Sequence, residues 1–75
     1  MWVTIDTYKT GINLKELFKK HDYTVKEIAY ELKVHPKTVY RWCCGDKIPA
    51  YENIVGLSII LGEPIENIVV FHVRY

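Results

Sequence analysis

Residues 35–42, with the sequence HPKTVYRW, gather several hydrogen-bonding side chains into one very short stretch. Lys37 and Arg41 are four residues apart, so on a helix they would stand on the same face. Thr38 and Tyr40 flank them. Ammonium, guanidinium and hydroxyl groups on one exposed helix face can donate to phosphates and to base edges in a DNA major groove. These residue types therefore predict DNA recognition, with solvated surface charge as the alternative.

The distribution of charge singles out the same stretch. Residues 1–32 hold five Lys and five Asp or Glu, residues 33–47 hold four Lys or Arg and one Asp, and residues 48–75 hold one Arg and three Glu. The three segments carry 0, +3 and −2, which sum to the net charge of +1. Clustered positive charge is the footprint expected of a nucleic-acid binder.

The length and composition are those of one small globular domain, which we assign to residues 1–75. The longest apolar stretch, IVGLSIILG, is about half the ~20 residues that a membrane helix needs. The first ten residues, MWVTIDTYKT, lack the basic and then apolar layout of a signal peptide. We therefore expect a cytoplasmic protein without a membrane segment.

The residues that could support other chemistry are few. Cys43 and Cys44 are neighbours, which cannot easily form a disulfide, so we expect two free thiols, one packed and one exposed. The three His residues show no metal-site spacing. No paired carboxylates, activated nucleophile or phosphate-binding Gly loop can be recognised. We expect no enzymatic activity, no cofactor and no metal.

Five short helices should position these side chains. The first should cover residues 13–21, because Asn13 can cap it and Glu16 completes a capping-box-like pair. Gly11 is interpreted as the break before this helix. Its apolar face should comprise Leu14, Leu17 and Phe18, with Lys15, Lys19 and Lys20 solvated.

The second and third helices should form a helix-turn-helix. The second should begin at Thr24, since TVKE is a capping box, and the third near Pro36, a residue suited to the first helical turn. Gly45 should end the third helix in a left-handed conformation. The inward residues should be Val25, Ile28, Ala29 and Leu32 on the second helix and Val39 and Trp42 on the third.

The rest of the chain should form a fourth helix over residues 51–61, a fifth from Pro64, and a strand at each end. The end segments WVTIDT and VVFHVRY alternate apolar and polar residues, as strands do. One helix-turn-helix contacts about half a site, and such proteins read two half-sites as dimers. We expect the ends to pair within one chain and to support a weak homodimer through that face and the fifth helix.

At these positions the chain resembles the Cro/phage-repressor (XRE) family of helix-turn-helix DNA-binding proteins. The matching residues are Ala29, Val34, Val39, Trp42, Gly45, Pro49, Leu61 and Gly62, with Ile65 and Ile68 in the closing helix. The resemblance covers about residues 12–70, with the motif over about 25–44. It implies an all-α, five-helix lambda-repressor-like domain, here with a short N- and C-terminal strand pair.

Three residues depart from the family's pattern. Val25 stands where a Gln often contacts DNA, so Thr24 or Lys26 should take over a phosphate contact. Lys33 replaces a common Gly in the turn, which predicts left-handed backbone strain of ~1 kcal/mol. Cys43 replaces a usual Glu behind the third helix.

The resemblance implies a set of DNA-binding positions, some with an alternative role. They are Thr24, Lys26, His35, Pro36, Lys37, Thr38, Tyr40, Arg41 and Lys47. His35 could simply cap the third helix, and Tyr40 could lie along the fourth helix instead of touching DNA. Trp42 is expected in the core.

The function that follows is a sequence-specific DNA-binding transcriptional regulator, a bacterial or phage repressor that reads an operator in double-stranded DNA with its third helix. The alternative is an antitoxin or protein-interaction adaptor on the same fold, with a toxin or another protein as its partner.

Overall fold

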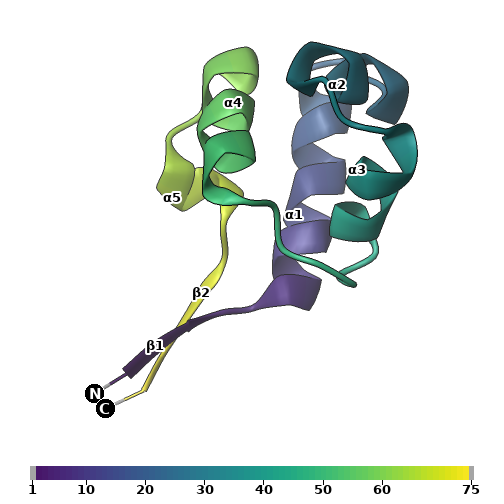
Figure 1. The fold of residues 1–75 in the computed structure, drawn as a ribbon. Coiled ribbons are helices and arrows are strands. Elements are labelled where there is room, and N and C mark those ends of the chain that lie inside the picture. The colour runs from purple at the N-terminus through teal and green to yellow at the C-terminus, as the bar shows by residue number, and fades with distance from the viewer. Residues whose placement is uncertain (1, 75) are drawn as a thin grey trace.

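Five helices and a two-stranded ribbon make up residues 2–74, the part of the chain that the computed structural model describes (Figure 1). In chain order they are β1 (Trp2–Ile5), α1 (Thr7–Lys20), α2 (Val25–Leu32), α3 (Pro36–Cys43), α4 (Tyr51–Leu61), α5 (Ile65–Ile68) and β2 (Phe71–Arg74). The mainly helical fold with a terminal strand pair confirms the predicted fold class.

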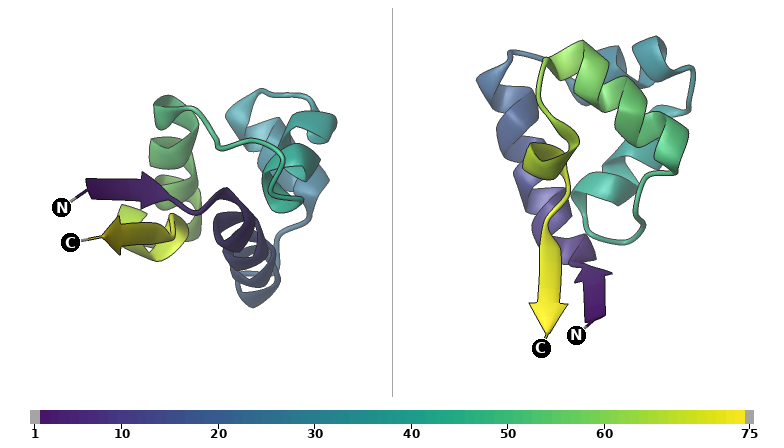
Figure 2. Two further views of the ribbon diagram at one scale, coloured as in Figure 1. Left: turned by 90° about the horizontal axis from the view of Figure 1, so that it is seen from below. Right: turned by 90° about the vertical axis from the view of Figure 1, so that its left-hand side faces the viewer.

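The core lies between α1, the α2–α3 pair and the α4–α5 pair. Helix α1 contacts both α3 and α5, so it joins the two pairs of helices (Figure 2). Its predicted apolar face is buried as expected, and α4 buries Ile54, Leu57 and Leu61. The buried apolar side chains are Leu14, Leu17, Phe18, Ile28, Ala29, Val39, Trp42, Cys43, Ile54, Leu57, Leu61, Ile68 and Val69.

Helix α1 begins six residues before the predicted start, at Thr7 instead of Asn13. Asp6 caps it, with its carboxylate accepting a hydrogen bond of 2.9 Å from the Lys9 backbone N–H. The predicted cap, Asn13, lies inside the helix, and its side-chain amide donates to the backbone carbonyls of Asn67 and Ile68. The capping-box spacing was misleading because the Asn13 side chain serves a distant segment.

Gly11 does not form the expected break before α1 but lies buried within this helix. A Cβ placed on Gly11 would be 2.6 Å from the carbonyl oxygen of Trp42 and 2.7 Å from that of Cys43. The glycine therefore lets the C-terminal end of α3 approach the α1 backbone closely.

The predicted limits of α2 and α3 are confirmed to within one residue. The Thr24 Oγ1 accepts from the Glu27 N–H at 3.1 Å, and the Thr24 N–H donates to the Glu27 carboxylate at 2.9 Å, which completes the capping box. Lys33 has the expected left-handed backbone, with φ 57° and ψ 43°. Pro36 opens α3, and Gly45 follows it with φ 76°.

The two strands pair antiparallel within the chain, as predicted, with Val3 opposite Val73 and Ile5 opposite Phe71. The base of this ribbon is held to α1, because the Val70 N–H donates to the hydroxyl oxygen of Thr10 in α1 at 3.0 Å. Beyond its base the ribbon projects away from the helices, and every described strand residue is exposed (Figures 1 and 2). Beyond its base, the ribbon therefore does not pack on the helices.

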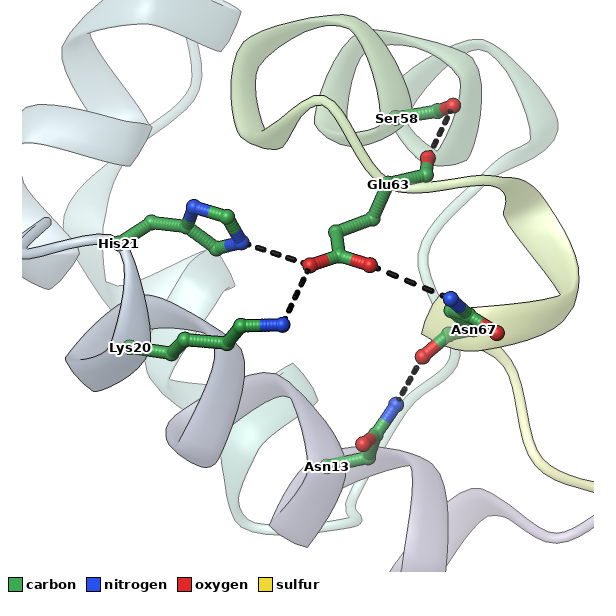
Figure 3. A network of polar contacts seen from close by, with 6 residues as sticks. All are labelled: Asn13, Lys20, His21, Ser58, Glu63 and Asn67. Atoms are coloured by element: carbon green, nitrogen blue, oxygen red, sulfur yellow. Dashed lines mark hydrogen bonds and ion pairs between the residues drawn. The ribbon is translucent and has the colours of Figure 1, made fainter.

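A network of polar contacts around Glu63 ties the end of α1 to the α4–α5 turn (Figure 3). The Glu63 carboxylate lies 2.7 Å from Nε2 of His21 and 3.2 Å from Nζ of Lys20, and it accepts from the Asn67 amide at 3.2 Å. The Ser58 hydroxyl donates to the Glu63 backbone carbonyl at 2.6 Å. The hydrogen bond with His21, followed by those from Asn67 and Lys20, lowers the pKa of Glu63 to about 2.

We expect Glu63→Gln to remove an acid-sensitive part of the stability. A carboxylate whose pKa is lowered on folding stabilises the protein fully above its unfolded pKa of about 4.3. That contribution disappears as the pH falls toward about 2. Urea midpoints measured across this range should therefore show a gap between wild type and Glu63→Gln that closes on acidification. A gap of equal size at both ends of the range would contradict the assignment, and the exposed Glu31→Gln is the control.

Candidate nucleic-acid interface

Helix α3 is fixed in place by the side chains on its inner face. Val39, Trp42 and Cys43 are buried, and Ala29 of α2, with 1% of its surface exposed, allows α3 to cross closely. Val34, in the turn between α2 and α3, packs against the same core. The opposite face of α3 is therefore presented to solvent in one orientation.

That outer face carries Lys37 and Arg41, both exposed and one helical turn apart. Pro36 and Thr38 lie half-buried at its margin. The Nε atom of Arg41 lies 3.9 Å from a carboxylate oxygen of Asp46, and both side chains are largely in solvent. An exposed pair of this kind contributes little, about 0–1 kcal/mol, so the guanidinium can exchange Asp46 for a DNA acceptor at small cost.

His35 performs the capping role that was one of its two predicted roles. Its Nδ1 accepts a hydrogen bond of 3.1 Å from the Lys37 backbone N–H at the start of α3. An accepting Nδ1 carries no proton, so the Nε2 of a neutral ring carries it and can donate to another group. Capping therefore leaves a donor on this exposed side chain.

The beginning of α2 presents Thr24 and Lys26, which are both exposed. The Thr24 oxygen is occupied as an acceptor in the capping box, but its hydroxyl proton remains available. Val25, between them, is half-buried and packs against the core, and its side chain has no group that could donate to a phosphate. Its hydrophobic role agrees with its departure from the family's pattern.

Lys47 lies in the loop that follows α3. The backbone N–H groups of Asp46 and Lys47 both donate to the Arg41 carbonyl, at 3.0 and 3.4 Å. These bonds turn the chain back over the C-terminal end of α3. The exposed Lys47 therefore lies beside the last turn of that helix.

Tyr40 lies on the side of α3 that faces α1 and the start of α2, and not along α4, which was its alternative position. It lines a depression of about 450 Å³ together with Val25, Phe18 and two lysines of α1, Lys15 and Lys19. The depression also reaches Cys43, and burial raises the pKa of this thiol while the nearby Lys15 ammonium opposes the rise. The thiol therefore stays protonated near neutral pH.

Lys15 and Lys19 are exposed, as expected for solvated side chains, and they border the same depression as Tyr40 of α3. Their spacing of four residues on α1 was visible in the sequence and placed them on one side of that helix. That this side meets α3 depends on the tertiary fold.

The cysteines are arranged as predicted, with Cys43 buried and Cys44 exposed. Among residues 2–74 no three His, Cys, Asp or Glu side chains gather as ligands for a metal ion. No helix in this described part of the chain is long and apolar enough to cross a bilayer.

Comparisons with known proteins agree with this arrangement. A family model described as a helix-turn-helix domain matches residues 23–61, which include α2, α3 and α4. Among solved structures, the chain is similar to the restriction-modification controller protein C.AhdI from Aeromonas hydrophila, with a TM-score of 0.77 and 21% sequence identity over 84% of this chain and 96% of that chain. At this identity the likeness shows the fold. A sequence comparison with curated proteins found no match.

Proposed function

Because the chain belongs to the helix-turn-helix domain family, we propose that it is a DNA-binding regulator of the Cro/phage-repressor type, which reads an operator through the outer face of α3 and acts as a bacterial or phage repressor. The observation that carries this proposal is the pair Lys37 and Arg41 on a helix fixed by its buried face. The pair belongs to residues 33–47, a segment that has a charge of +3.

The proposed contacts divide into two groups. Lys37 and Arg41 read base edges in the major groove, where a guanidinium pairs well with guanine. His35, Pro36 and Thr38 lie beside them at the start of α3, and Tyr40 meets a phosphate or a thymine methyl group. Phosphate contacts, which position the protein without reading sequence, fall to Thr24, Lys26 and Lys47. We add Lys15 and Lys19 to this second group, because their depression opens beside Tyr40.

The proposed functional unit is a weak homodimer in the cytoplasm, in which each copy is a single domain of residues 1–75. Each copy presents one α3, and two copies related by a two-fold axis would place their α3 helices about 34 Å apart on successive major grooves. Such a dimer reads an operator with two related half-sites.

A second candidate is an antitoxin or adaptor that binds a protein, such as a toxin, through the same fold. The exposed side chains of Tyr30, Tyr51 and Ile59, which lie outside the ribbon, favour this candidate. Titration of a random duplex at low salt separates the two, because a DNA-binding protein shows affinity that falls steeply with salt. An adaptor shows no salt-dependent binding.

Arg41→Ala should weaken binding to a selected operator half-site by about 1–3 kcal/mol and relax the preference at one base pair. The reason is that a base contact distinguishes one base from the others, whereas removal of a surface charge does not. Fluorescence anisotropy with the half-site and its single-base variants measures both effects. Equal affinity of wild type and Arg41→Ala for the selected site would contradict the proposal that Arg41 reads a base.

Lys47→Ala and Lys19→Ala should weaken binding to all duplexes alike. Each removes one phosphate contact, so the slope of log K against log salt concentration should fall in magnitude by about 1. Lys9→Ala, an exposed lysine of α1 outside the depression, is the control and should keep the wild-type slope. An unchanged slope for Lys19→Ala would show that Lys19 is a solvated side chain that makes no phosphate contact.

A further inference from the structure

The register of the terminal ribbon divides its side chains into two unlike faces. Residues directly opposite one another in an antiparallel pair share a face, and the faces alternate along each strand. Val3 with Val73 and Ile5 with Phe71 therefore form one face, which is entirely apolar. The other face holds the remaining pairs, Trp2 with Arg74 and Thr4 with His72.

The two faces differ in the contacts that their side chains make. On the polar face the Arg74 guanidinium lies over the Trp2 ring, 5.6 Å from its centroid, although Trp2 remains 53% exposed. On the apolar face, Val3, Ile5, Phe71 and Val73 remain 41–53% exposed. An isolated two-stranded ribbon is marginal in water, and it needs a packed face to be stable. This apolar face lacks such a cover within the described chain.

We infer that the apolar face of the ribbon packs against the same face of a second copy of this chain. The inference rests on the proposed function, in which two copies bind two half-sites, and it names the surface that joins them. It replaces the fifth helix in the expected interface, because the exposed residues of α5 are the polar Glu66 and Asn67.

The chemistry of the face selects this occupant. The face carries no charged side chain, so two copies can meet across a two-fold axis without repulsion, as a self-complementary interface requires. It has no donors for phosphates, which excludes DNA as its cover. Pairing of free strand edges would satisfy backbone groups but would leave the apolar side chains in water. Face-to-face packing removes them from it.

The size of the face sets the strength of the dimer. The four half-exposed side chains of each copy can bury much less area than the roughly 800 Å² per partner of a standard interface. The free protein should therefore dimerise only at high concentration. On an operator, binding of one copy raises the local concentration of the other, so even this weak contact increases overall affinity by roughly 100-fold or more.

Two neighbouring positions on β1 provide a matched test, since they lie on opposite faces. Val3→Lys places a charge on the apolar face, and Thr4→Lys places the same charge on the polar face. In sedimentation experiments at high concentration, wild type and Thr4→Lys should form dimers, and Val3→Lys should remain monomeric. Val3→Lys should also lose roughly 100-fold in affinity for the two-half-site operator while its half-site affinity stays unchanged. Circular dichroism should show the helices intact in both variants.

Three results would overturn the inference. Wild type could remain a monomer at the highest concentration, or Val3→Lys could dimerise as wild type does. Ile59→Lys, which alters an α4 residue that is 76% exposed, could be the variant that abolishes the dimer. If the wild-type protein did not bind a half-site at all, that result would contradict the proposed DNA-binding function. A failure of the dimer and a failure of DNA binding are therefore distinguishable.

Discussion

Trp42→Ala should unfold most of the protein instead of merely weakening its binding to DNA. The indole is 3% exposed and lies on the inner face of α3, within the core that fixes this helix. Replacing a buried aromatic residue by alanine costs about 3–5 kcal/mol. A chain of 75 residues buries relatively little surface, and a core of this size rarely supplies more than about 3–5 kcal/mol, so the substitution should remove most or all of the stability. Far-UV circular dichroism and urea titration measure the loss.

Tyr40→Ala is the matched control for this substitution. Tyr40 is an aromatic residue on the same helix, but it is 53% exposed. Its removal should leave the far-UV spectrum and the urea midpoint near those of wild type. A Trp42→Ala protein with the wild-type spectrum and midpoint would show that the indole does not support the core.

Gly11→Val should be almost as destabilising, although it adds atoms instead of removing them. A Cβ at this position meets two carbonyl oxygens of α3, at 2.6 and 2.7 Å, and backbone atoms cannot rotate aside as a long side chain can. Overpacking in a core costs typically 1–3 kcal/mol, and this contact belongs at or above the upper limit, about 3 kcal/mol or more. The melting temperature followed by circular dichroism should fall accordingly.

The neighbouring exposed residue provides the comparison. Ile12→Val introduces the same side chain one position later on α1, where Ile12 is 39% exposed. It should change the melting temperature little. If Gly11→Val melted at the wild-type temperature, α1 and α3 would have to be farther apart than the structure places them.

The elements with local signals could be predicted from the sequence. Thr24 and Glu27 are three residues apart and cap α2 by bonding to each other, so the pattern contained both partners. Pro36 marks the start of α3 by its own ring geometry. The alternation of the two chain ends likewise indicated strands, and their pairing followed from the need of each strand for a neighbour.

The features that the sequence did not reveal all depend on contacts between distant segments. Asn13 has the residue type and spacing of a cap, but its amide serves the carbonyls of Asn67 and Ile68. Gly11 resembles a helix breaker until α3 is placed against it. No local pattern distinguishes these roles from the ones we expected.

The candidate site shows the same division between local and tertiary information. The spacing of Lys37 and Arg41 on an amphipathic helix was sufficient to predict that both side chains would be exposed on one face. The position of Tyr40 was not predictable, because it depends on how α3 packs against α1. For the same reason Lys15 and Lys19 could not be associated with α3 before the helices were arranged.

The central claim is that the outer face of α3 reads DNA sequence, and selection of bound duplexes from a random pool tests it most directly. Wild type should enrich a motif of two related half-sites, with centres about 34 Å or one helical turn apart. Under the same conditions Arg41→Ala should lose the preference at one base pair in each half-site and retain it elsewhere. Failure of the wild-type protein to enrich any motif, or enrichment of an identical motif by Arg41→Ala, would contradict the claim.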